Sequence, residues 1–185
     1  MLDTIAMLER YFCGTSLQVI IDHGRAVAGL AGTIGRELVL PDDDLNFIEE
    51  AAMLHDIGVC RVRAIDMGLY GEFPYIMHGI LGREILEAQG LPLHALVCER
   101  HIGVGLSVDD IVSQQLPLPQ RAMMPVSVPE QVICFADLFY SKNLGKLDQR
   151  KSVAHVRNKL ARFGNEKLQI FDTWCERFGT VFQPG

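Results

Sequence analysis

The chain has 185 residues, of which 49% are hydrophobic and 22% are charged, and its formal net charge is −6. This length is enough for one globular domain with a buried core, and the balance of residue types excludes a wholly disordered chain. No block of Lys and Arg occurs, which argues against binding to nucleic-acid polymers or membrane surfaces through a basic face. A phosphorylated small molecule stays compatible with this charge, because bound metal ions supply local positive charge.

The cysteines and the apolar segments bear on the compartment. The five cysteines are widely scattered and none forms a C-x-x-C motif, so we expect reduced thiols rather than disulfides or a zinc knuckle. The sequence has no apolar run of about 18 residues and no signal peptide at its start. We therefore expect a soluble, cytoplasmic protein that does not enter a membrane.

Helical periodicity runs along almost the whole sequence. Near the N-terminus the apolar residues of two segments, Leu2 to Phe12 and Ile20 to Ile34, fall at helical spacing. Further helices are predicted at residues 42–55, 75–89, 92–101, 129–144, 148–163 and 165–178. No long alternating pattern indicates a sheet. The sequence therefore predicts an all-α protein.

The predicted helix at 42–55 has clear signals at both ends. Pro41 and the run Asp42–Asp44 supply N-terminal capping groups and negative charges that suit the positive end of the helix dipole. Gly58 is predicted to end this helix.

Residues 103–129 depart from the helical pattern. This segment contains four of the eight prolines and one short helical patch, around Val108 to Gln114. A long irregular segment in a compact domain is more often functional than idle. We expect it to form a lid or a wall that sets specificity.

Several histidines and one aspartate stand at the ends or on the apolar faces of predicted helices: His23, His55 in "AAMLHD", His78 in "HGILGREIL", His101 in "LVCERH" and Asp137 in "QVICFADLF". Each one alone is more often a hydrogen-bonded core residue, and a lone buried Asp can pair with an Arg or cap a helix. As an ordered set, with an Asp directly after the second His, they can converge in a helical bundle. Imidazole nitrogens and carboxylate oxygens form metal sites in such cores.

With these residues the sequence resembles the HD-domain superfamily of metal-dependent phosphohydrolases, over roughly residues 17–145, and "LHDIG" is close to the motif that names it. By this resemblance the ligands shared across the superfamily are His23, His55, Asp56 and Asp137. The two further histidines of its two-metal members correspond to His78 and His101. The resemblance implies one HD domain over residues 1–185, a helical bundle of the HD-domain type, with C-terminal helices at 148–178 packing on the core.

The His-Asp pair suits a metal centre at a helix end. Neighbouring helical residues diverge by about 100°, so His55 and Asp56 can approach one cation from two sides. The resemblance implies that Asp56 bridges two ions. One or two divalent ions of iron, manganese, zinc, cobalt or nickel would suit these ligands. Such a centre keeps positive charge, attracts a phosphoryl oxygen and lowers the pKa of bound water.

The basic residues that contact phosphate are less clearly indicated. Many phosphodiesterases of the superfamily carry a Lys directly after the motif's Gly, where this chain has Val59. Arg61 could replace that Lys, or it could be an ordinary surface arginine. Lys142 is the stronger candidate, because it falls one helical turn and a residue beyond Asp137.

The Gly-Tyr-Pro signature of the cyclic-di-GMP branch is missing, so that activity is not expected. The expected catalytic residues are Asp56, Lys142 and Arg61.

The leading hypothesis is a hydrolase of a small phosphorylated metabolite or nucleotide, working through metal-activated water. The ligand set also resembles that of small bacterial hydrolases that split dinucleoside tetraphosphates. Two alternatives stay open: a di-iron oxygenase of the same superfamily, and a non-catalytic, metal-stabilised domain that senses a ligand or binds a partner. We expect a small phosphorylated molecule as the partner and leave a homodimer open.

Overall fold

The computed structural model describes residues 2–143, 145, 147 and 149–182. The α-helices of this part are α1 (Thr4–Glu9), α2 (Gly14–Glu37), α3 (Asp42–Leu54), α4 (His78–Ala88), α5 (Pro92–Arg100), α6 (Val108–Ser113), α7 (Val128–Asp137), α8 (Val153–Leu160) and α9 (Asn165–Phe178). Short 3-10 helices are η1 (Ile57–Arg61), η2 (Ile65–Met67), η3 (Tyr75–Met77), η4 (Ala161–Phe163) and η5 (Gly179–Phe182). A two-stranded antiparallel ribbon joins β1 (Arg63–Ala64) and β2 (Leu69–Tyr70). The prediction of an all-α fold is confirmed. In this described part, no helix is both long and apolar enough to cross a bilayer.

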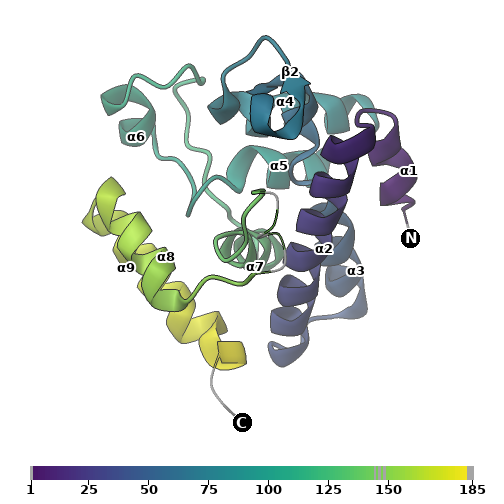
Figure 1. The fold of residues 1–185 in the computed structure, drawn as a ribbon. Helices are drawn as coiled ribbons and strands as arrows, with labels where there is room; N and C mark the ends of the chain where they lie inside the picture. The colour runs from purple at the N-terminus through teal and green to yellow at the C-terminus, as the bar shows by residue number, and fades with distance from the viewer. Residues whose placement is uncertain (1, 144, 146, 148, 183–185) are drawn as a thin grey trace.

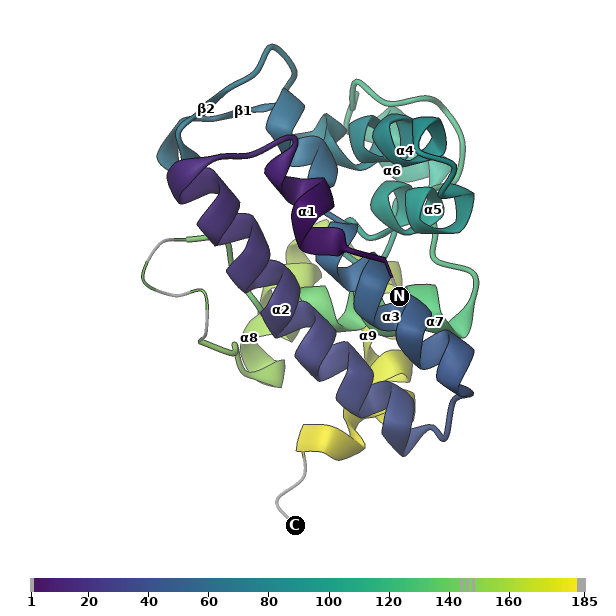
Figure 2. The same cartoon turned by 90° about the vertical axis from the view of Figure 1, so that its right-hand side faces the viewer.

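The helices surround two hydrophobic cores. Helices α2 and α3 lie side by side, as do α4 and α5, while α7 runs through the middle of the molecule (Figures 1 and 2). One core joins Val27 of α2 to Phe135 of α7 and Phe171 of α9. The other core joins Ile20 of α2 to Leu81 of α4. Along α2 the sequence therefore passes from one core to the other between residues 20 and 27.

Helix α7 begins at a strong cap that also connects it to α5. The Ser127 hydroxyl accepts a hydrogen bond from the backbone N–H of Glu130, and the Glu130 carboxylate accepts one from the N–H of Ser127. The second carboxylate oxygen lies 2.9 Å from the Arg100 guanidinium at the end of α5. These contacts fix the start of α7 against the end of its neighbour.

Helix α7 ends at Asp137, so the helix predicted to run to residue 144 is too long; residue 144 lies outside the described residues. The backbone N–H of Lys151 donates to the carbonyl of Phe139. The Lys151 ammonium donates to the carbonyls of Leu138, at 3.2 Å, and Tyr140. Because a residue far along the chain satisfies these carbonyls, the backbone can leave the helix.

The next predicted helix, at 148–163, begins later than expected. Helix α8 starts at Val153, and the Ser152 hydroxyl at its N-cap accepts a hydrogen bond from the N–H of His155. Residue 148 lies outside the described residues. An N-cap serine explains the start, because its side chain satisfies a free N–H of the first turn.

Gly58 does not end α3, as the sequence pattern suggested. Helix α3 stops at Leu54, and Gly58 lies buried inside η1. A Cβ atom on Gly58 would lie 2.0 Å from the carbonyl oxygen of His78 and 2.3 Å from the backbone nitrogen of Gly82. Glycine is therefore required for the close approach of η1 to α4 rather than for a left-handed helix cap.

The segment at 103–129 packs against the domain, and α6 occupies the predicted helical patch. Ile111, Leu118 and Met123 form a small cluster of their own against residues 76–80. The buried Lys167 ammonium of α9 donates to the carbonyl of Gly105, at 2.9 Å, and pairs with Asp110. These contacts hold the segment on both sides.

We expect Gly58→Ala to destabilise the protein by about 3 kcal/mol, because the methyl group meets backbone atoms of α4 that cannot move independently. Gly29→Ala is the matched control, since Gly29 is exposed on α2 and a Cβ there meets nothing within 4 Å. The control should gain up to about 1 kcal/mol from better helix propensity. Urea denaturation measures both; equal stabilities of the two variants would contradict the role of Gly58.

We expect Glu130→Gln to lower the free energy of unfolding by about 1–3 kcal/mol at pH 7, because the charged bond to Arg100 is lost. Burial raises the pKa of Glu130, but Arg100 and the capping N–H groups outweigh it and hold the pKa below 4.5. A carboxylate whose pKa is lower in the folded than in the unfolded protein stabilises the fold at a pH above its ordinary pKa. This stabilisation is lost as the pH falls through the pKa of the folded protein. The difference between wild type and variant should therefore shrink below about pH 4.5. Glu176→Gln, an exposed change on α9, is the matched control and should change neither the free energy of unfolding at pH 7 nor its dependence on pH. Urea denaturation at several pH values measures both.

Candidate metal centre

Six side chains predicted as ligands converge at one place in the fold. They come from five helices and their ends: His23 of α2, His55 and Asp56 after α3, His78 at the start of α4, His101 after α5 and Asp137 at the end of α7. All four histidines and Asp56 are at most 5% exposed. His23 lies on the stretch of α2 where the two hydrophobic cores meet, so the centre lies between them.

Asp56 divides the centre into two halves. Its Oδ2 atom lies 3.3 Å from His23 Nε2 and 3.1 Å from His55 Nε2. Its Oδ1 atom lies 3.5 Å from His78 Nε2 and 3.6 Å from His101 Nε2. Asp137 belongs to the first half, since its Oδ1 atom lies 2.9 Å from His23 Nε2. Each carboxylate oxygen of Asp56 therefore faces its own pair of histidines.

Three of the histidines are held by the helix turn that precedes them. The Nδ1 atoms of His55, His78 and His101 lie 2.6, 2.6 and 2.8 Å from the carbonyl oxygens of residues 52, 75 and 98 respectively. In each case the carbonyl lies three residues earlier. A carbonyl only accepts, so Nδ1 carries the proton and the Nε2 lone pair points into the centre. In metal sites, a hydrogen bond of this kind fixes which ring nitrogen of a histidine carries the proton and orients the ring toward the ion.

The atoms inside the centre need a cation. With protons on Nδ1, the Nε2 lone pairs of His78 and His101 face each other at 3.0 Å. In the described part of the chain, His23 Nε2, His55 Nε2 and Asp56 Oδ1 are buried without a hydrogen-bond partner, while Asp56 Oδ2 lies against the Lys142 ammonium. Ligand atoms about 2.1 Å from one ion lie roughly 3.0–3.4 Å apart, which is close to the distances found here. The residues therefore fit a metal ion, and the two halves fit two.

A general sequence model of the HD domain matches residues 20–140 of this chain, a range that holds all six of these ligand candidates. The chain belongs to the HD-domain family. The Listeria monocytogenes phosphodiesterase PgpH has an HD domain whose crystal structure superposes with a TM-score of 0.53 at 12% identity, covering 98% of this chain and 99% of that one. This likeness shows that the two share the fold.

Curated relatives of this HD domain are longer proteins. A tRNA (cytidine(56)-2'-O)-methyltransferase of Thermoplasma volcanium is 30% identical over 148 residues, which are 80% of this chain and 38% of that enzyme. The protein of the same name in Picrophilus torridus is 26% identical over 68% of this chain and 31% of its own length. Uncharacterized protein MJ0778 of Methanocaldococcus jannaschii is 32% identical over 51% of this chain and 48% of its own length. The chain thus matches less than half the length of each.

The electrostatics of the HD centre favour ionised carboxylates. Burial raises the pKa of Asp56, but His55 and Lys142 outweigh burial and hold that pKa well below its ordinary value. Burial lowers the pKa of His78 to about 3, so its imidazole is neutral. For His55, burial lowers the pKa, but Asp56 and Asp137 raise it to about 10. A cation between those carboxylates would take the place of that proton.

The structure brings one of the two predicted basic residues to the centre. The Lys142 ammonium lies 2.7 Å from Asp56 Oδ2, although the backbone between Asp137 and Lys142 is not helical. Arg61 instead contacts Glu84, at 2.7 Å, and stacks on the ring of Phe73. The role of Arg61 in phosphate binding stays a prediction without support from these contacts.

Sequence reasoning missed Tyr75. Its carbonyl accepts the hydrogen bond from His78, and its ring lies 4.8 Å from the His78 ring. Its hydroxyl interacts with Lys142, and burial raises its pKa to about 12. Its position three residues before a ligand candidate, His78, at a helix start could have drawn attention to this residue.

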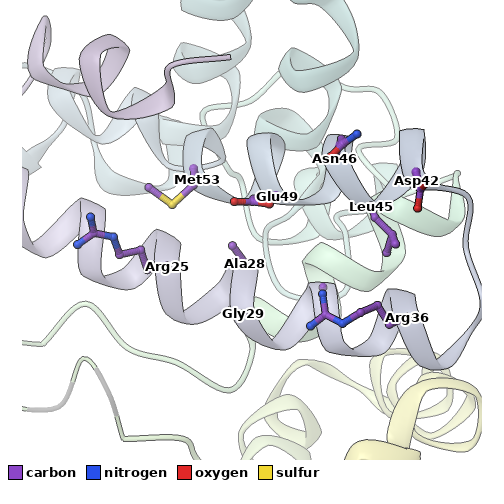
Figure 3. Close-up of a pocket in the computed structure, with 10 residues that line it drawn as sticks. Arg25, Ala28, Gly29, Arg36, Asp42, Leu45, Asn46, Glu49 and Met53 are labelled. Atoms are coloured by element: carbon purple, nitrogen blue, oxygen red, sulfur yellow. The ribbon is translucent and has the colours of Figure 1, made fainter. Parts of the chain in front are cut away.

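Two cavities open beside Lys142. One, of about 630 Å³, is lined by residues 64–67 together with Tyr75, Lys142 and Asn143. The other, of about 320 Å³, is lined by Asp137, Lys142 and residues of α8. A separate cavity of about 650 Å³ lies in the groove between α2 and α3 (Figure 3). Its described lining residues include none of the six ligand candidates, so this groove is not part of the centre.

We expect the protein to bind two divalent ions per chain and His101→Ala to retain one. The substitution removes a ligand from the Oδ1 half of Asp56 and leaves His23, His55 and Asp137 in place. Elemental analysis of purified, metal-loaded protein measures the stoichiometry. His155→Ala is the matched control, because His155 is exposed on α8. Retention of both ions by His101→Ala, or loss of both, would contradict the division of the centre.

Proposed function

We propose that this HD domain is a metal-dependent phosphohydrolase acting on a small phosphorylated metabolite or nucleotide. The observation that carries the proposal is the bridging position of Asp56. One buried carboxylate faces two pairs of imidazoles and also contacts an ammonium that borders two cavities. This arrangement joins a two-metal ligand set to a cation and to space for a substrate.

The residues of the chain have distinct parts in the proposed reaction. Bound divalent ions supply polarisation of the phosphoryl group and a lower pKa for the attacking water. The four histidines and Asp137 hold and orient the centre, and Asp56 keeps its halves together. The Lys142 ammonium, beside the centre and 18% exposed, binds a phosphoryl oxygen or the leaving oxygen. The Tyr75 hydroxyl positions Lys142.

Of the similar proteins, one has a name that agrees with the proposed hydrolysis, and two have names that describe a different reaction. A phosphodiesterase whose HD domain shares the fold agrees with phosphoester hydrolysis. The two tRNA methyltransferases extend far beyond the matched part, so their methyl transfer is not proposed for this chain. The net charge of −6 also favours a small molecule over an RNA polymer as the substrate.

We expect the protein loaded with manganese or iron to hydrolyse at least one member of a panel of nucleotides, cyclic nucleotides and dinucleoside polyphosphates. Asp56→Asn should lower kcat/KM by at least about a hundredfold, because the bridging charge is lost. Chromatography of the released products measures both the hydrolysis of the panel and the kcat/KM of the variant. Asp43→Asn, an exposed change at the start of α3, should keep full activity.

The panel also separates the alternatives. No hydrolysis by protein that elemental analysis shows to be fully loaded would contradict the proposal. Oxygen uptake by the iron-loaded protein would favour the di-iron oxygenase, and metal-dependent thermal stability without turnover would favour a sensing domain.

A further inference from the structure

We propose that the 320 Å³ cavity beside Asp137 is a second anion subsite, which binds a further phosphate of a polyphosphate substrate through Lys142, Lys151 and Lys159. This inference rests on the proposed hydrolase function and narrows its substrate class. The substrate would carry a chain of phosphates, as nucleoside polyphosphates do, rather than a single phosphoryl group.

The cavity borders the candidate metal centre. Asp137 and Lys142 line the cavity and also belong to the centre, where Lys142 contacts Asp56. The remaining wall comes from Tyr75 and Gly103, from Leu138 and residues 140–143, and from Lys151 and α8, where Val156 and Leu160 are apolar. A ligand that occupies the cavity therefore lies next to any group held at the centre.

The charges around the cavity are mostly positive. Three of the five lysines in the sequence line it, in a chain whose net charge is −6. Asp137 is the only acidic side chain among the described lining residues, and it faces His23 and His55. The positive charges of this wall therefore have no carboxylate of their own within the cavity.

Lys151 and Lys159 are placed to bind an anion. The Lys151 ammonium donates to the carbonyls of Leu138 and Tyr140. These hydrogen bonds hold the ammonium in position, but the neutral carbonyls do not cancel its charge. Lys159 is exposed on α8 and has no carboxylate within 4.0 Å among the described residues. Burial and the nearby Lys159 and Lys142 lower the pKa of Lys151, as expected where like charges gather. An anion in the cavity would relieve this repulsion.

The geometry distinguishes two kinds of substrate. One phosphoryl group at the centre would contact Lys142 and leave Lys151 and Lys159 without a ligand. A polyphosphate would place one phosphate at the centre and the next beside the two outer lysines. Lys159 thus becomes a residue that sets specificity for polyphosphates and does not touch the reacting phosphorus.

The test compares Lys159→Gln with Arg162→Gln in the metal-loaded protein. Both changes remove one positive charge from an exposed side chain, but Arg162 does not line the cavity. Isothermal titration measures the affinity for inorganic tripolyphosphate and for orthophosphate, and the thermal midpoint checks folding. We expect Lys159→Gln to weaken tripolyphosphate binding by about tenfold, with orthophosphate binding unchanged. Arg162→Gln should leave the affinities for tripolyphosphate and for orthophosphate unchanged. Tripolyphosphate can also chelate the bound metal, and this effect is the same for both variants.

Three outcomes would overturn the subsite: unchanged tripolyphosphate binding in Lys159→Gln, an equal loss for orthophosphate, or an equal loss in Arg162→Gln. Failure of the subsite and failure of the hydrolase function are distinguishable. Hydrolysis of phosphorylated compounds, together with tripolyphosphate binding that Lys159→Gln leaves unchanged, would overturn the subsite alone. Selective tripolyphosphate binding without turnover of any phosphorylated compound would overturn the hydrolase function and leave the subsite in place.

Discussion

The Asp56 carboxylate is the constraint around which the centre is arranged. It is 1% exposed and surrounded by four imidazoles and one ammonium. A buried carboxylate is costly unless positive charge compensates it. Its backbone leaves α3 directly after His55, and its two oxygens face opposite halves of the centre.

The close packing that unites these ligands depends on glycines at helix contacts. A Cβ atom on Gly58 would overlap the backbone of α4, and one on Gly82 of α4 would lie 3.1 Å from Cys98 Cβ of α5. On the other side, a Cβ on Gly24 of α2 would lie 3.2 Å from Met53 Cα of α3. These contacts form a chain from α2 through α3 and η1 to α4 and α5. Each link brings a histidine-bearing backbone closer to the next than side chains with a Cβ would allow.

The sequence was sufficient to predict most of the helices and the side chains that converge, but not the features that depend on contacts between distant residues. Periodicity indicates an amphipathic helix, and an ordered set of His and Asp on several helices indicates a common centre. The end of α7 depends on Lys151, which lies 14 residues beyond Asp137 and satisfies carbonyls that a local pattern assigns to a longer helix. The prediction that Lys142 lies near the centre used helical spacing that the structure does not have. Lys142 reaches Asp56 because the chain turns there. Tyr75 carries no motif, and its position follows only from the packing of η3 beside α4.

The family match and the lysines of the cavity wall lie in different parts of the chain. The HD-domain match covers residues 20–140 and contains all six ligand candidates, whereas Lys142, Lys151 and Lys159 lie after it. The C-terminal helices are fastened to the domain by aromatic packing, with the ring of Phe135 on α7 lying 5.8 Å from that of Phe171 on α9. Because this packing fixes α8 beside the end of α7, the cations of the C-terminal part form a wall of the cavity next to the centre. If the proposed function holds, the six ligand candidates would supply the metal chemistry, and the lysines after the matched part would bear on which phosphorylated molecule binds beside the centre.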